Sequence, residues 1–203
     1  MGTAKYPDEN EYSEYIKNKG GYYNAFTSLT ETNYHFEVSN EGFEKALDMF
    51  AQFFISPLMG ESQTAREMNA VDSEFNMSQQ SDAWRKFMMI QTISHEESTL
   101  HRFNCGNLES LKQEGIREAL LAFHKKWYSA NIMELVVTGK HTLEFLEKWV
   151  TEMFSAVENK NVVEPNLGEP KHPFTHENLS TLIRFKPIKD SDTIEIQWCL
   201  PNL

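Results

Sequence analysis

Cysteine is scarce in this 203-residue chain, and no long hydrophobic run is present. Cys105 and Cys199 lie far apart and outside any C-x-x-C arrangement, so we expect no disulfide framework and a reducing, cytoplasmic compartment. The longest apolar stretch, MFAQFFISPLM at 49–59, contains Pro57 and is too short to span a bilayer. The first thirty residues show no apolar core of a secretory signal. These absences predict a soluble protein with no membrane partner.

Positive charge is also in short supply. The chain has 19 Lys and Arg residues against 30 Asp and Glu residues, which gives a net charge of −11. Nucleic acid and anionic membrane surfaces bind to clusters of Lys and Arg, so neither is an expected partner of this acidic chain. A negative field of this kind favours basic or polar peptides. The 40% share of hydrophobic residues is enough to bury a core in one domain.

Several catalytic and phosphate-binding motifs are missing. The sequence contains no G-x-x-x-x-G-K-[ST], G-x-G-x-x-G or G-x-S-x-G. It therefore gives no support for a phosphate-binding loop or for the nucleophilic serine turn of a hydrolase. His95 starts a run like H-E-x-x-H but the second histidine is absent. In HPFTH at 172–176, the two histidines flank Pro173 in an expected loop, which favours a surface role over a metal site. Neither cysteine has an evident histidine partner, so cysteine catalysis has little support.

Hydrophobic periodicity and turn residues predict a mixed chain of helices and strands. Helices are expected within 7–21, 40–57, 61–93 with a break near SQQSD, 116–129 and 142–157. Strands are expected at 22–28 and 32–39, which form a hairpin, and at 132–139, 179–187 and 192–201. Irregular segments are expected at 94–107 and, as a long internal loop with three prolines, at 158–178. This order predicts one α+β domain over 1–203, a largely antiparallel sheet with helices packed on one face.

One pair of acidic residues stands out in AREMNAVDSEFN, at 65–76. Glu67 and Glu74 are seven residues apart, so two helical turns bring them to nearly the same face. They could be a solvated acidic face beside a buried stripe made of Met68, Ala70 and Val71. Alternatively, one of them ligates a metal. The other then does not touch the metal but holds one of the metal's other ligands in position. A catalytic zinc normally takes three protein ligands and a water, so the two carboxylates alone are not sufficient.

Several stretches together resemble a known family. They are MGTAKYPDENEYSEYI, GGYYNAFTSLTETNYHFEV, ALDMFAQFFISPL, NAVDSE, SDAWRKF, GNLESL, FHKKWYSAN, LEKWVTEMFSAVENKNV, HPF and PIKD. In content and order they resemble the pitrilysin-type (inverzincin) zinc metallopeptidases, in their insulin-degrading-enzyme and nardilysin group. The resemblance covers essentially the whole chain and implies a pitrilysin/processing-peptidase-like metallohydrolase domain that hydrolyses peptides.

The resemblance assigns roles to the acidic pair and to the NAFT strand. Glu74 matches the family's glutamate zinc ligand, and Glu67 matches the acidic residue that supports the metal-binding histidines. Along NAFT, an extended peptide would lie on the strand and bond to Asn24, Ala25 and Thr27.

Three aromatic residues match an apolar pocket in the same family. Phe26, Trp84 and Phe87 would receive the side chain that follows the scissile bond. Ordinary core packing is the alternative for these aromatic residues, and without the resemblance it is the preferred reading for Phe87.

The chain departs from the family pattern at the zinc motif. The family's H-x-x-E-H supplies two histidine ligands and a general base, and it lies a few residues before the stretch that matches MGTAKYP. None of the seven histidines here replaces it. The first strand, the zinc-motif helix and the remaining peptidase domains are also expected to be missing. Peptide hydrolysis would then belong to a full-length parent, and this chain alone would be inactive and bind zinc weakly at best.

A second class of function stays open. A non-catalytic family-like domain could serve as a scaffold or peptide-binding partner. The Glu67 and Glu74 pair and the intact NAFT strand favour peptidase ancestry, because a scaffold needs neither.

Overall fold

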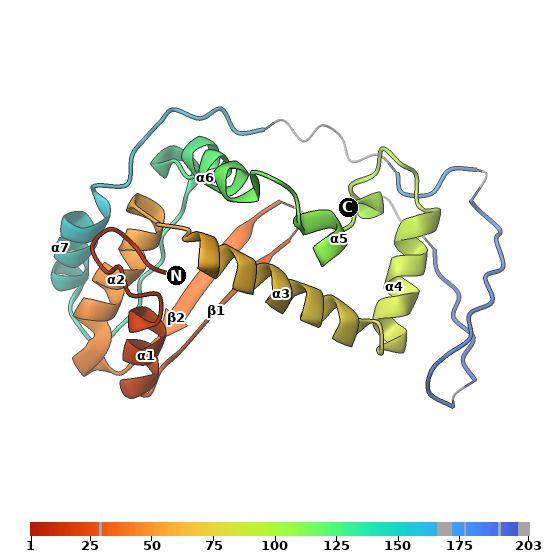
Figure 1. Cartoon of the computed structure of the whole chain (residues 1–203), viewed down its shortest axis with the longest axis horizontal. Helices are drawn as coiled ribbons and strands as arrows, with labels where there is room; N and C mark the ends of the chain where they lie inside the picture. The colour runs from red at the N-terminus through yellow and green to blue at the C-terminus, as the bar shows by residue number, and fades with distance from the viewer. Residues whose placement is uncertain (29, 166–171, 177, 191, 199–203) are drawn as a thin grey trace. The chain divides into compact units, whose positions relative to one another are not determined.

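The computed structural model describes residues 1–28, 30–165, 172–176, 178–190 and 192–198. The helices are α1 (Glu11–Asn18), α2 (Phe43–Ile55), α3 (Glu61–Ser78), α4 (Asp82–Ile93), α5 (Leu108–Leu111), α6 (Ile116–Trp127) and α7 (Leu143–Phe154). The strands are β1 (Tyr22–Thr27) and β2 (Thr32–Glu37) (Figure 1). Single 3-10 turns lie at Asn40–Gly42, Thr99–His101 and Ala130–Ile132. The chain divides into two compact units, Met1–Arg66 with Gln113–Pro165 and Glu67–Lys112 with Asn166–Leu203.

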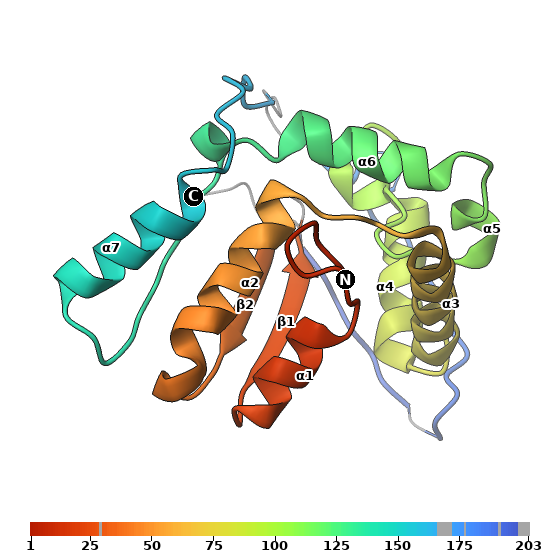
Figure 2. The same cartoon turned by 60° about the vertical axis from the view of Figure 1, so that its left-hand side comes forward.

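The first unit contains a β-hairpin with helices on one of its faces. β1 and β2 pair antiparallel in an unbroken register from Tyr22↔Glu37 to Thr27↔Thr32. The rings of Tyr23 and Phe36, which oppose each other in this register, both lie against Tyr12 of α1. Helices α1 and α2 lie side by side over this face (Figure 2). Because strand side chains alternate, Tyr22, Asn24 and Phe26 point to the opposite face.

The core of this unit forms around α2. Its buried residues recur at helical spacing and are Ala46, Leu47, Met49, Phe50 and Ala51. Phe50 joins Tyr12 and Ile16 of α1 in one cluster, and Leu47 joins Leu146 and Trp149 of α7 in a second. Phe36 of β2 packs against both clusters, so the hairpin, α1, α2 and α7 share a continuous apolar interior.

Helix α6 is joined to the end of α2 by polar contacts. The Arg117 guanidinium donates to the carbonyl of Met59 at 2.6 Å. Met59 has a φ of 43°, so this contact stabilises a left-handed residue in the connection after α2. Further along α6, the Nε2 atom of His124 lies 3.2 Å from the Phe53 carbonyl oxygen, and its ring stacks on Tyr128. Burial lowers the pKa of His124, so the neutral ring donates this bond at pH 7.

The second unit contains α4, α5 and the part of α3 from Glu67 onward. Helix α4 turns back from the end of α3 after a short break at 79–81 (Figure 1). Ser81 caps α4 by accepting the Trp84 N–H, which explains why the helix restarts there. The sequence break predicted near SQQSD is therefore confirmed.

Helix α5 was not predicted from the sequence, and it lies against α3. The carboxylate of Asp72 accepts the Leu108 N–H at 2.8 Å, at the first residue of α5. Asn107 and Ser110 complete a capping box at the same end. A side chain at Gly106 would come within 2.9 Å of Val71, so glycine allows this close approach.

Three predicted strands are wrong within the described residues. Residues 133–139, 179–187 and 192–198 form no ladder, and residues 199–201 of the last one lie outside the described residues. Val136 is 84% exposed, so the segment 132–139 is not the buried strand that its composition predicted. Alternating apolar residues favour extended backbone, but a strand also needs a neighbour that bonds its N–H and C=O groups.

The predicted α+β class, the hairpin and the helices are confirmed. Of the loop predicted at 158–178, residues 166–171 and 177 lie outside the described residues, and one domain over 1–203 stays a prediction. In the part of the chain that the structure describes, we find no helix long and apolar enough to cross a membrane.

Candidate functional site

The backbone of β1 presents hydrogen-bonding groups along its outer edge. The Ser28 N–H donates to the Glu31 carbonyl at 2.8 Å, which makes these two residues a hydrogen-bonded pair. Hydrogen-bonded and non-hydrogen-bonded pairs alternate along an antiparallel ladder. Ala25 and Thr27 therefore belong to non-hydrogen-bonded pairs, and their N–H and C=O groups point away from β2. The Ala25 N–H is held at 2.9 Å by the Asn24 side-chain oxygen, in agreement with this direction.

The outer edge of β1 is unpaired within the described residues. The sheet has the order β1-β2, so among the described residues no third strand pairs with β1. All six residues of β1 are exposed, and none of them is charged. Phe26 is 50% exposed on the face opposite to α1 and α2. The structure thus places Asn24, Ala25, Phe26 and Thr27 on one accessible strand.

Glu67 and Glu74 lie on α3, as the sequence predicts, and both side chains are exposed. Their spacing places them on nearly one helical face, about 10.5 Å apart along the axis. Met68 and Val71 are half-buried, so these two parts of the predicted stripe are correct. Ala70 is exposed, and its assignment to the stripe is wrong because it lies on the outer side of the acidic pair.

The acidic pair is only part of a metal site. Within the described residues, no group of three or more His, Cys, Asp or Glu side chains is close enough to hold a metal ion. A catalytic zinc needs three protein ligands, so the described residues fit the carboxylate part of such a centre and do not complete it. His172 and His176 are exposed, and His172 contacts the Phe174 carbonyl at 2.7 Å, as expected for surface residues.

Trp84 and Phe87 are half-buried on α4. The Trp84 ring meets Phe75 of α3 edge-on at 5.5 Å, and Phe75 meets Phe103 at 5.6 Å. Sequence reasoning missed Phe75 and Phe103. Phe75 lies four and seven residues after Val71 and Met68, a spacing that could have identified it as part of the buried stripe.

The start of α4 is held by the chain near its C-terminal end. The Asp82 carboxylate accepts the N–H groups of Ile188 and Lys189 at 2.8 and 3.0 Å. These two bonds lower the pKa of Asp82, because they favour the ionised form. The Arg85 guanidinium stacks on the Phe185 ring next to them. The backbone around PIKD therefore fixes the first turn of the helix that carries Trp84.

The predicted site residues fall into two groups. Asn24, Ala25, Phe26 and Thr27 belong to the first unit, whereas Glu67, Glu74, Trp84 and Phe87 belong to the second.

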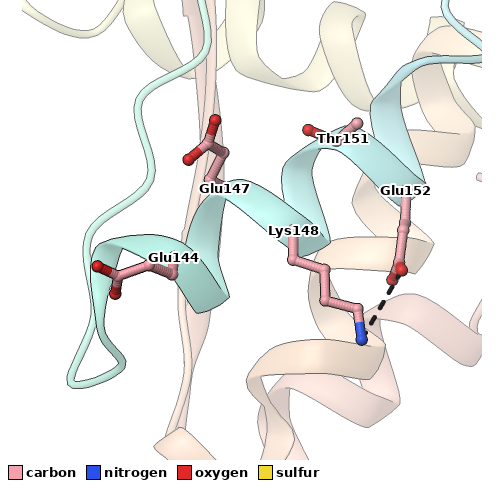
Figure 3. A pocket seen from close by; sticks show the side chains of 5 residues that line it. All are labelled: Glu144, Glu147, Lys148, Thr151 and Glu152. Atoms are coloured by element: carbon pink, nitrogen blue, oxygen red, sulfur yellow. Dashed lines mark ion pairs between the residues drawn. The ribbon is translucent and has the colours of Figure 1, made fainter.

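A separate hollow lies on the outer side of α7 and is lined by Glu144, Glu147, Lys148, Thr151 and Glu152 (Figure 3). Its Lys148–Glu152 pair at 3.9 Å is an ordinary surface contact, and the hollow contains none of the predicted site residues.

The described fold is of the α+β class, and comparisons with known proteins identify its family. Residues 1–103 match the family model described as Insulinase (Peptidase family M16), and residues 115–203 match the one described as Peptidase M16 inactive domain. The chain belongs to the insulinase family of peptidases, M16.

Individual relatives support the same assignment. The chain is 46% identical to the insulin-degrading enzyme of Homo sapiens over 94% of this chain and 19% of that protein. It is 43% identical to the insulin-degrading enzyme of Drosophila melanogaster over 100% of this chain and 21% of that protein. The crystal structure of pitrilysin matches with a TM-score of 0.78 at 34% identity, over 84% of this chain and 18% of that one. The chain therefore spans about a fifth of the length of these relatives.

Proposed function

We propose that this chain is the peptide-binding part of a zinc-dependent endopeptidase of the insulin-degrading type. The observation that carries the proposal is the outer edge of β1, where the backbone groups of Ala25 and Thr27 point outward from an exposed strand. An extended peptide adds to such an edge through main-chain hydrogen bonds. The net charge of −11 favours basic peptides. Phe26 offers an exposed ring to peptide side chains on the uncovered face.

The acidic pair on α3 has a role in a longer parent. Glu74 is the carboxylate ligand of a zinc ion, and Glu67 supports the remaining ligands. Their exposed positions on one face of α3 and the family relationship support this assignment. A zinc ion held in part by Glu74 would supply the activation of a water molecule and the polarisation of the scissile carbonyl. Since the described residues do not complete the ligand set, the 203-residue chain alone is not expected to hydrolyse peptides.

Trp84 and Phe87 are proposed to bind the apolar side chain that follows the scissile bond. Both rings are only half-buried, and the Trp84 ring is supported by Phe75. The remaining peptidase domains of the longer parent are the other proposed partners, since this chain spans about a fifth of its relatives.

A non-catalytic peptide-binding or scaffold domain is the second candidate. It is favoured by one observation, the match of residues 115–203 to a family model described as an inactive domain. The two candidates differ in their need for Glu74. A scaffold tolerates its loss, whereas a peptidase does not.

Replacing Ala25 by proline is expected to weaken peptide binding about tenfold. The substitution removes the central outward N–H, worth about 1 kcal/mol, and its ring hinders the approaching strand. The β1–β2 bonds are retained, because Ala25 belongs to a non-hydrogen-bonded pair. Fluorescence anisotropy with a labelled, unstructured basic peptide measures the affinity.

Thr32→Pro is the matched control for this experiment. Thr32 opposes Thr27 in the register, so its N–H points outward from β2 rather than from β1. The affinity of the Thr32→Pro variant for the peptide should stay within about twofold of that of the unmodified chain. An equal loss of peptide affinity in both variants, or no loss of affinity in Ala25→Pro, would contradict strand addition on β1.

A further inference from the structure

The outer edge of β1 lacks the features that keep edge strands apart. Proteins protect such edges with charged side chains, prolines or bulges. The sequence of β1, YYNAFT, contains no charged residue and no proline. Its register with β2 is regular, so no bulge twists the edge away. A strand of this kind is able to pair with any chain that offers a complementary edge.

The positions of the outward groups are symmetric about Ala25. Outward N–H and C=O groups belong to Tyr23, Ala25 and Thr27, the alternate residues of the strand. If a second copy approaches antiparallel, a two-fold axis at Ala25 pairs Ala25 with itself and Tyr23 with Thr27. The three pairs, Ala25 with Ala25, Tyr23 with Thr27 and Thr27 with Tyr23, then each exchange two backbone hydrogen bonds. The edge is therefore complementary to itself.

The charges along the hairpin distinguish this edge from the outer edge of β2. A two-fold axis at Tyr34, which is the equivalent position on β2, would place Glu37 directly opposite Glu31 of the other copy, and this would occur twice. Like charges that face each other across a ladder are destabilising. The register centred on Ala25 brings no charged residue within β1 opposite another.

We propose that the outer edge of β1 is a self-association surface, on which a second copy of this chain pairs antiparallel about a two-fold axis at Ala25. The result is a four-stranded sheet in the order β2-β1-β1-β2. Dimer formation displaces the Asn24 side-chain oxygen from the Ala25 N–H, which is its present partner. Asn24 thus opposes pairing, and Asn24→Ala is expected to strengthen the dimer.

The dimer and the proposed peptide compete for the same edge but respond oppositely to salt. Two copies each carrying −11 repel one another, so screening by salt strengthens self-association. A basic peptide is attracted by the same charge, so salt weakens its binding. The self-association rests on the edge alone and does not depend on the proposed peptidase function.

Analytical ultracentrifugation of the purified chain, without peptide, tests the inference. A concentration-dependent dimer is expected at micromolar to 100-micromolar concentrations, and it should increase between about 50 and 500 mM NaCl. Ala25→Lys and Ala25→Glu should each weaken it about tenfold, because the axis places two like charges opposite each other. An equimolar mixture of the two variants should restore it, and a misfolded protein would not show this rescue.

The outcomes separate this inference from the proposed function. An unmodified chain that stays monomeric to 100 micromolar overturns the inference, whether or not it binds peptides. A dimer that persists in both charged variants, or a mixture that stays monomeric, overturns the register centred on Ala25. A dimer that is rescued by the mixture supports the inference even if no peptide binds.

Discussion

Glu74→Gln is expected to abolish zinc-dependent peptide cleavage in a longer chain that also supplies the H-x-x-E-H histidines. In the proposed assignment Glu74 is one of three zinc ligands, and the substitution leaves a neutral amide in its place. Glu67→Gln should be milder and lower zinc affinity by about 10–100-fold, the usual cost of losing a group that orients a ligand. Zinc content and cleavage of a fluorogenic peptide are the measurements.

Glu61→Gln is the control for these two variants. Glu61 is an exposed acid at the start of the same helix and has no proposed role. It should leave zinc content and cleavage unchanged. A Glu74→Gln enzyme that retains zinc and cleaves peptides would refute the role of Glu74 and favour the scaffold candidate.

Leu47→Ala is expected to destabilise the first unit by about 2–5 kcal/mol, a large part of the free energy of unfolding of a typical domain. Leu47 is 1% exposed and packs against Leu146 and Trp149, so its loss leaves a cavity between α2 and α7. Leu143→Ala on α7 is the matched control, because Leu143 is 80% exposed. The Leu143→Ala substitution is expected to lower the free energy of unfolding by less than about 0.5 kcal/mol.

Urea unfolding followed by circular dichroism measures both changes. A Leu47→Ala variant as stable as the control would show that α7 does not pack on α2 in solution. The comparison holds the chemistry of the substitution constant and changes only the burial of the side chain.

Local sequence patterns were sufficient for the helices and for the hairpin. The apolar spacing of α2 and the aromatic, β-branched runs of β1 and β2 are signals within a few residues. The segments 132–139 and 179–187 carry similar strand signals but form no ladder with any of the described residues. Strand pairing depends on a partner far away in the sequence, so composition alone could not establish it. Helix α5 has only four residues, too few for a periodic pattern.

The sequence suggested the residues of the candidate site, whose roles stay predictions, but it did not suggest how their backbone and side chains are arranged. The spacing of Glu67 and Glu74 correctly indicated one helical face. The outward direction of Ala25 and Thr27 depends on the pairing of Ser28 with Glu31, which sequence reasoning did not address. Asp82 is held by backbone groups about a hundred residues later, a contact that no local pattern reveals.

Amide hydrogen exchange at β1 tests the central claim most directly. With a saturating basic peptide, and at a protein concentration too low for self-association, exchange of the Ala25 and Thr27 amides should slow strongly. The Thr32 amide, on the far edge of the hairpin, should be unaffected. Unchanged exchange at Ala25 and Thr27 with the peptide bound would show that peptides do not add to β1, and the proposed mode of binding would be wrong.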